Sequence, residues 1–163
     1  TDANSAYQMV SMLEGVVRRG TARGMRDLPF PVAGKTGTTN DNTNGWFVGF
    51  TPDLVVGVYV GFDKLKPLGK RETGSTAAVP IFESFITAAM QNRPQIPFRR
   101  PDGINLYTIN ARTGVRASPQ DPDSLLEAFK PGQEPLIDSG DNAVIGNDGG
   151  ASGQGERDVP SLY

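Results

Sequence analysis

Two neighbouring apolar runs constrain the fold of this chain more than any other feature. Trp46–Phe50 and Leu54–Phe62 are separated only by the sequence Thr-Pro-Asp. A connection of three residues joins antiparallel strands, so we expect these runs to form a hairpin. In the second run, Leu54 and every second residue after it share one face. The intervening positions include Gly57 and Gly61, and we expect a helix or another backbone to pack closely on that face.

Helical patterns lie on both sides of this hairpin. Ser5 and Gln8 have the spacing of a capping box, an apolar stripe follows, and Gly20 stands where a helix commonly ends. This pattern predicts a helix over residues 5–19. Thr76 can cap a second helix, which we expect to end at Asn92-Arg93-Pro94.

The fold class follows from the order of these elements. Val32–Thr38 can form a strand ahead of the hairpin, so strands are adjacent in the sequence and helices flank them. This order predicts an α+β fold, an antiparallel sheet flanked by helices. Three strands are few for an independent sheet of this kind, so we expect the chain to be the C-terminal portion of a longer domain.

Composition excludes several kinds of chemistry. The 163 residues contain no cysteine and no histidine. Cysteine or histidine zinc sites, thiol nucleophiles and Ser-His-Asp triads are therefore excluded, and no cofactor is expected. Residues 1–120 carry 14 basic and 9 acidic side chains. This modest excess suits an anionic ligand but is too small for nucleic-acid binding, so no nucleic-acid partner is expected.

The composition also suggests three parts. Residues 1–95 hold the helices and the three strands, and residues 96–120 are expected to form a small hairpin. Residues 121–163 carry 2 basic and 9 acidic side chains and are rich in Gly, Asp and Ser. This last part is expected to be a flexible acidic tail.

One motif carries candidate chemistry. Residues 33–39 read Ala-Gly-Lys-Thr-Gly-Thr-Thr. A Walker A loop would need a glycine where this chain has Pro29, and a helix would have to follow the Lys-Thr pair. An Asn-rich turn follows instead, which disfavours a nucleotide-binding domain. The alternative is the Lys-Thr-Gly strand of serine penicillin-recognising enzymes.

A longer block supports that alternative. From Gly34 to Asp63 the sequence GKTGTTNDNTNGWFVGFTPDLVVGVYVGFD closely resembles the class A, bifunctional penicillin-binding proteins. The later segments TGSTAAVPIFESFI and GINLYTINARTG resemble their last transpeptidase helix and the small hairpin after it. The resemblance covers about residues 5–120 and implies the C-terminal part of a transpeptidase domain with a serine β-lactamase-like fold.

The resemblance implies roles for four residues. Lys35, Thr36, Gly37 and Thr38 would form a substrate-binding edge strand, with Lys35 and Thr38 also catalytic. The lysine would shape the electrostatics, and the two threonine hydroxyls would bind the carboxylate of a D-Ala-D-Ala terminus or a β-lactam. The Thr38 N–H would be one oxyanion-hole donor.

The other family motifs are missing from this chain. No serine is followed three residues later by lysine, and none begins Ser-x-Asn. The resemblance therefore implies a nucleophile on an upstream half of the same domain, and this chain alone is expected to be inactive. The parent would be a peptidoglycan synthase, also a glycosyltransferase, on the periplasmic face of the bacterial inner membrane, held by an upstream anchor. The other hypothesis is a non-catalytic binding or scaffolding module of the same fold.

Overall fold

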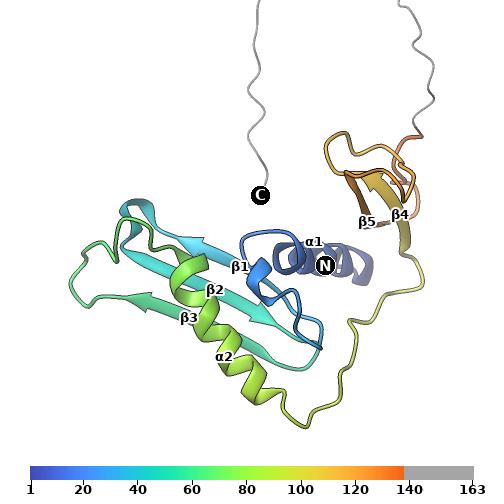
Figure 1. The fold of residues 1–163 in the computed structure, drawn as a ribbon. Coiled ribbons are helices and arrows are strands. Elements are labelled where there is room, and N and C mark those ends of the chain that lie inside the picture. The colour runs from blue at the N-terminus through green and yellow to red at the C-terminus, as the bar shows by residue number, and fades with distance from the viewer. Residues whose placement is uncertain (138–163) are drawn as a thin grey trace, which may run out of the picture.

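The computed structural model describes residues 1–137, in which an α-helix precedes a three-stranded sheet, a second helix and a separate two-stranded sheet (Figure 1). The elements are α1 (Ala3–Arg18), η1 (Arg23–Met25), β1 (Ala33–Thr38), η2 (Asn40–Asn42), β2 (Asn44–Phe50), β3 (Val55–Gly61), η3 (Gly74–Ala78), α2 (Val79–Ala89), β4 (Asn105–Asn110) and β5 (Ser124–Phe129).

The first sheet is antiparallel throughout, in the order β1-β2-β3. Its register places Phe47 of β2 between Thr36 of β1 and Val58 of β3. The expected hairpin and the strand ahead of it are therefore confirmed. Phe47 is fully buried, so this register fixes which face of the sheet carries the core.

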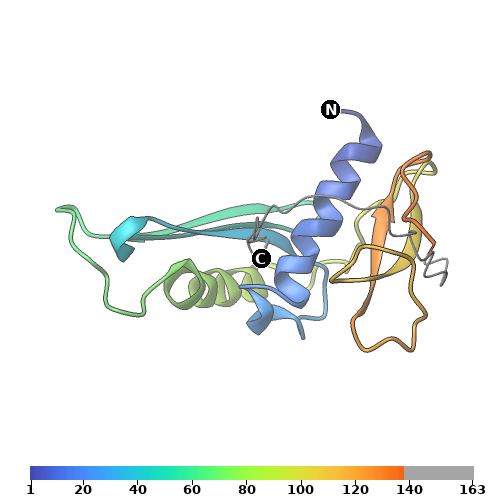
Figure 2. The ribbon, with the colours of Figure 1, turned by 90° about the horizontal axis from the view of Figure 1, so that it is seen from above.

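The helix α2 lies across one face of the sheet, and α1 lies beside β1 at the end of the sheet (Figures 1 and 2). Phe82 of α2 packs edge-on against Phe47, with ring centroids 4.7 Å apart. Val16 and Val17 of α1 join the same buried cluster. The α+β fold with an antiparallel sheet flanked by helices is confirmed.

The packing on the glycine face of β3 differs from what the sequence predicts. The core lies against the opposite face, where Val56, Val58 and Val60 pack on the buried cluster. An added Cβ at Gly57 would have the Val48 side chain, 4.0 Å away, as its nearest neighbour. The glycines of β3 therefore face outward within the described part of the chain, because helix packing follows the larger apolar area of the valines.

Both helix starts lie upstream of the predicted caps. Asp2, not Ser5, caps α1, because its carboxylate accepts hydrogen bonds from the Ser5 N–H at 2.9 Å and the Ser5 hydroxyl at 2.8 Å. Thr73, not Thr76, begins the second helical segment at η3, and the Thr76 hydroxyl accepts from the Thr73 N–H at 2.8 Å. Thr76 thereby supplies the return contact of a capping box, whereas Ser5 only donates to the Asp2 carboxylate.

The hairpin expected within residues 96–120 is wrong in its second strand. β4 pairs with β5 from Asn105↔Phe129 to Asn110↔Ser124, while Arg116 makes only an isolated bridge to Ile109. A strand therefore lies within residues 121–163, where a flexible tail was expected. The rest of that expectation concerns residues 138–163, which lie outside the described residues.

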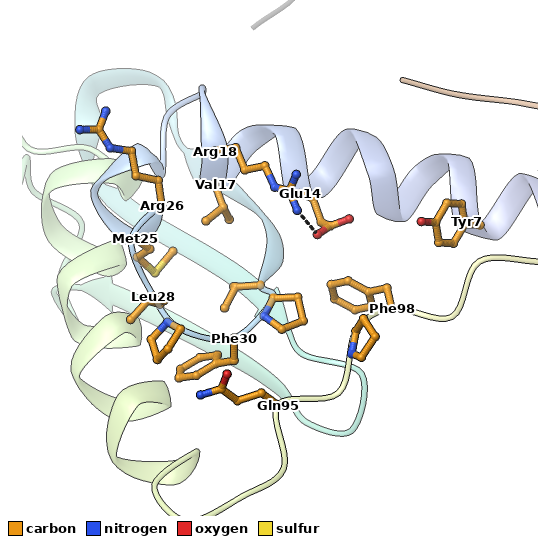
Figure 3. A pocket seen from close by; sticks show the side chains of 14 residues that line it. Tyr7, Glu14, Val17, Arg18, Met25, Arg26, Leu28, Phe30, Gln95 and Phe98 are labelled. Carbon is orange, nitrogen blue, oxygen red and sulfur yellow. Dashed lines mark hydrogen bonds and ion pairs between the residues drawn. The ribbon is translucent and has the colours of Figure 1, made fainter. Parts of the chain in front are cut away.

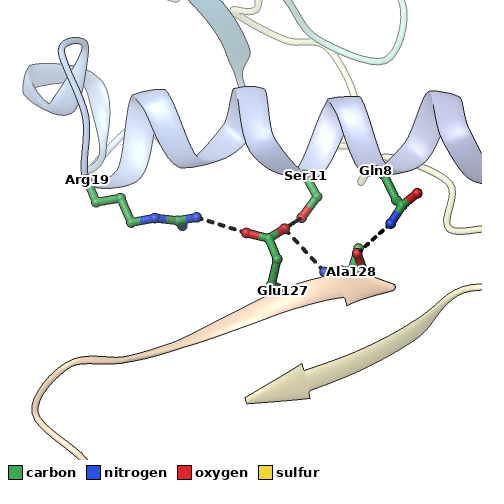
Figure 4. A network of polar contacts seen from close by, with 5 residues as sticks. All are labelled: Gln8, Ser11, Arg19, Glu127 and Ala128. Atoms are coloured by element: carbon green, nitrogen blue, oxygen red, sulfur yellow. Dashed lines mark hydrogen bonds and ion pairs between the residues drawn. The ribbon is translucent and has the colours of Figure 1, made fainter. Parts of the chain in front are cut away.

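The second sheet is attached to α1 by polar contacts (Figure 4). Glu127 of β5 accepts hydrogen bonds from the Ser11 hydroxyl at 2.7 Å and from the Arg19 guanidinium at 3.1 Å. The Gln8 side-chain amide donates to the Ala128 carbonyl at 3.1 Å.

None of the helices in residues 1–137 has the length and apolar character that a membrane span needs.

Candidate functional site

The outer edge of β1 is free of a strand partner among the described residues. The Thr39 N–H donates to the Asn44 carbonyl of β2 at 3.2 Å. Main-chain groups alternate in direction along an antiparallel strand, so the N–H and C=O groups of Lys35 and Gly37 also face β2. The N–H and C=O groups of Thr36 and Thr38 are therefore directed to the outer edge, where an extended peptide could pair with them.

The Lys35 side chain supplies a positive charge at this edge. Lys35 is exposed, and its Nζ donates to the Thr36 carbonyl at 2.9 Å and lies 3.5 Å from the Thr36 hydroxyl. No acidic side chain of the described residues forms an ion pair with Lys35. The ammonium group is therefore available to attract an anion to the strand.

Two threonine hydroxyls lie on the other face of the strand from Lys35, and each has a partner behind it. The Thr36 hydroxyl lies 2.9 Å from the hydroxyl of Thr21. The Thr38 hydroxyl accepts from the Gly74 N–H at 3.0 Å. Since a hydroxyl can accept one bond and donate another, the Thr38 proton remains free for a ligand.

Close packing of η3 against the backbone of β1 and β2 supports this arrangement. A Cβ at Gly74 would lie 2.4 Å from the Trp46 carbonyl oxygen and 2.5 Å from that of Gly37. Only glycine fits there, which lets η3 lie directly on the backbone of β1 and β2. A Cβ at Gly37 would instead meet the Trp46 Cβ at 3.3 Å, on the open face.

Three residues of this site were not identified from the sequence. Thr21 comes from the loop after α1, and Gly74 and Ser75 come from η3. The Ser75 hydroxyl donates to the Thr21 carbonyl, which joins the two segments. Loop residues far apart in the sequence carry no periodicity that would bring them together, although Gly74 and Ser75 belong to the segment TGSTAAVPIFESFI, which resembles a transpeptidase helix.

Thr21 and Ser75 also line a hollow of about 770 Å³ between the loop after α1 and the start of α2. Arg19, Arg23 and Arg26 contribute to its wall. Arg19 is paired with Glu127, and Arg26 lies 3.5 Å from the Asp27 carboxylate. Three arginines therefore line this hollow, and neighbouring carboxylates partly neutralise two of them.

A second cavity, of about 420 Å³, lies between α1, the loop after η1 and the segment that follows α2 (Figure 3). Apolar and polar side chains share its wall, with Phe30 and Phe98 on one side and Glu14 on the helix. Burial raises the pKa of the Glu14 carboxyl, and the Arg18 guanidinium at 3.1 Å partly opposes that shift. None of the Lys-Thr-Gly-Thr residues lines this cavity.

The arrangement on β1 suits recognition of an extended, anionic peptide. Main-chain donors and acceptors, a cation and two hydroxyls converge on one strand edge. Within residues 1–137, no three acidic side chains gather in a way that could hold a metal ion. A nucleophile with an adjacent base is not formed by Lys35 to Thr38 alone.

Comparisons with known proteins identify the family. The penicillin binding protein transpeptidase domain family matches residues 1–87. Penicillin-binding protein 1A of Rickettsia bellii is 44% identical over 147 residues, which are 90% of this chain and 18% of that protein. Penicillin-binding protein 1A of Pseudomonas aeruginosa is 44% identical over 130 residues, 79% of this chain and 16% of that protein.

A solved structure gives the same result. The crystal structure of penicillin-binding protein 1A from Haemophilus influenzae matches with a TM-score of 0.72 and 29% identity, over 83% of this chain and 21% of that chain. The chain thus spans less than a fifth of the length of the curated relatives named above. The match over residues 1–87 and these relatives confirm the resemblance stated from the Gly34–Asp63 block: the chain belongs to the penicillin-binding protein transpeptidase family.

Proposed function

We propose that this chain supplies the substrate-binding strand of a serine-type DD-transpeptidase that cross-links peptidoglycan through an acyl-enzyme intermediate. The observation that carries the proposal is the outer edge of β1. There the Thr36 and Thr38 main-chain groups, their hydroxyls and the Lys35 ammonium group are all presented along one strand edge that has no strand partner among the described residues. Membership of the transpeptidase family supports the same chemistry.

Each group has a distinct role in this proposal. The Thr36 and Thr38 hydroxyls bind the carboxylate of a stem peptide that ends in D-Ala-D-Ala, or of a β-lactam, while Lys35 supplies positive potential. The Thr38 N–H is one donor of the oxyanion hole, which stabilises the charge that develops on the attacked carbonyl. Gly37, with no side chain, lets the substrate backbone approach the strand.

The nucleophilic serine and its base would come from an upstream half of the same domain. The face of the sheet opposite α2 exposes apolar side chains, among them Trp46 at 44% and Tyr59 at 50% of their surface, with ring centroids 4.8 Å apart. An apolar sheet face of this kind favours a covering partner. We propose that the upstream half covers it, and that the chain alone is inactive.

The cellular setting belongs to the same proposal. The parent protein would act on the periplasmic face of the bacterial inner membrane, attached by sequence upstream of this chain, and would also carry a peptidoglycan glycosyltransferase. Stem peptides and β-lactams are its proposed ligands.

The test is labelling with fluorescent penicillin of the full protein that contains this chain, compared with its Lys35→Ala variant and with an exposed control, Lys64→Ala. We expect wild type and control to label equally and Lys35→Ala to label at least tenfold more slowly, because a hydrogen bond that involves a charged group contributes on the order of 1.5–3 kcal/mol. Equal labelling of Lys35→Ala would refute the site. Absence of labelling in the wild type would favour the non-catalytic module.

A further inference from the structure

Thr21, in the loop after α1, lies directly behind the candidate carboxylate-binding threonine. Its hydroxyl oxygen is 2.9 Å from that of Thr36, which is a normal distance for a hydrogen bond between two hydroxyls. The same threonine has no role assigned by the family motif, which begins at Lys35. The question is what a second hydroxyl at this position does.

The backbone holds Thr21 in place from both sides. The Gly20 N–H donates to the Gly15 carbonyl at 3.1 Å, and the Ala22 N–H donates to the Val16 carbonyl at 3.1 Å. Ala22 is fully buried, so the chain cannot shift there without disturbing the core. The Ser75 hydroxyl donates to the Thr21 carbonyl, and Arg19, two residues earlier, is paired with Glu127 of β5 (Figure 4).

The direction of the hydrogen bond follows from what Thr36 must do. A hydroxyl has a single proton, so if Thr36 donates that proton to a substrate carboxylate, its oxygen must accept the bond from Thr21. Thr38 offers a direct parallel, because its oxygen already accepts from the Gly74 N–H at 3.0 Å. Each of the two threonines then has a donor behind it and its own proton directed to the ligand, and Lys35 Nζ also lies 3.5 Å from Thr36 Oγ1.

We propose that Thr21 is a positioning residue, whose hydroxyl donates to Thr36 Oγ1 and thereby aims the Thr36 proton at the carboxylate of the substrate or β-lactam. This inference rests on the proposed function. Hydrogen bonds in such a chain strengthen one another, and an oriented donor does not have to rotate when the anion binds. Thr21 acts through Thr36 and does not touch the substrate in this account.

The test measures acylation of the full protein by benzylpenicillin and by its methyl ester, which lacks the free carboxylate. The variants are Thr21→Val, which keeps the shape but loses the hydroxyl, Thr21→Ser, which keeps the hydroxyl, and Thr36→Val. Thr87→Val, an exposed threonine on α2, is the matched control. Time courses over a range of concentrations separate the dissociation constant of the first complex from the acylation rate constant.

We expect Thr21→Val to weaken acylation by the free acid about 3- to 10-fold, the range for loss of one hydrogen bond, mainly through the dissociation constant. Thr21→Val should change acylation by the methyl ester no more than Thr87→Val does. Thr21→Ser should restore most of the acylation by the free acid that Thr21→Val loses. Combined with Thr36→Val, the Thr21→Val change should add little, because both act on the same hydrogen bond.

Two results would overturn the inference. One is a Thr21→Val variant that matches Thr87→Val on the free acid while Thr36→Val is impaired, which would leave the proposed function standing. The other is an equal loss on acid and ester, which would indicate a general structural role. If Thr36→Val distinguishes the free acid from the ester as well as wild type does, the proposed function fails, and Thr21 has nothing to position.

Discussion

Replacing Gly74 by alanine tests how η3 supports the candidate substrate-binding strand. The added Cβ would lie 2.4 Å from the Trp46 carbonyl oxygen, 2.5 Å from the Gly37 carbonyl oxygen and 3.2 Å from the Gly37 nitrogen. All three are backbone atoms of β1 and β2, so no side chain can rotate away. The start of η3 must therefore move off the sheet, which also breaks the 3.0 Å hydrogen bond from the Gly74 N–H to Thr38.

The size of the effect can be estimated from these two losses. Overpacking of a well-packed site costs about 1–3 kcal/mol. A lost hydrogen bond adds about 0.5–1.5 kcal/mol. Alanine recovers up to about 1 kcal/mol through its higher helix propensity. We expect Gly74→Ala to lower the free energy of unfolding by about 1–3 kcal/mol and to slow acylation by penicillin, because Thr38 loses the donor behind its hydroxyl.

The assay is calorimetric unfolding of the full protein, in which the transpeptidase transition is identified as the one that shifts after acylation by penicillin. Gly24→Ala is the matched control, since no atom lies within 4 Å of a Cβ at that position. If Gly74→Ala unfolds at the same temperature as Gly24→Ala and labels as fast, the close packing of η3 on β1 is wrong.

Three further predictions concern α1. Glu127→Ala should destabilise the contact between β5 and α1 by about 1–3 kcal/mol, because Ser11 and Arg19 lose their shared acceptor; hydrogen exchange of the β4 and β5 amides would measure it. The Ser5 N–H and hydroxyl lower the pKa of Asp2 from 3.8 to about 2. Protection of the first turn of α1 from hydrogen exchange should therefore be complete above pH 4 and should be lost as the pH falls towards 2. The Asp2→Asn variant should show no such change. Burial raises the pKa of Glu14 above 4.5, so ionisation of this carboxyl opposes folding. The stability present with Glu14 protonated should therefore be lost as the pH rises from 4.5. Glu14→Gln should remove this pH dependence in melts recorded at several pH values, and an unchanged profile would contradict the prediction.

The sequence predicted the sheet better than the ends of the helices. Alternating apolar residues and a short connection determine β2 and β3, because register and burial both depend on a period of two. The helix caps were misplaced, since Ser5 and Thr76 are good cap residues by type. Asp2 and Thr73 precede them by three residues each and form the actual caps, with the predicted residues as their partners.

Contacts between distant segments could not be predicted from local patterns. β5 lies in a segment with an acidic composition typical of disorder, yet Leu125 and Ala128 pair with β4 and the Glu127 carboxylate binds α1. The Lys-Thr-Gly-Thr strand was identified through the family resemblance, and its edge position agrees with the sheet order. Thr21 and Gly74 were missed because their roles arise only when the loop after α1 and η3 meet β1.

The most direct measurement is a crystal structure of the full protein acylated by penicillin. We expect the penicillin carboxylate within about 2.7–3.2 Å of both Thr36 Oγ1 and Thr38 Oγ1, and the ester carbonyl oxygen at the same distance from the Thr38 nitrogen. The acylated serine should lie on sequence outside this chain. An adduct whose carboxylate and carbonyl oxygens lie away from the outer edge of β1 would contradict this expectation.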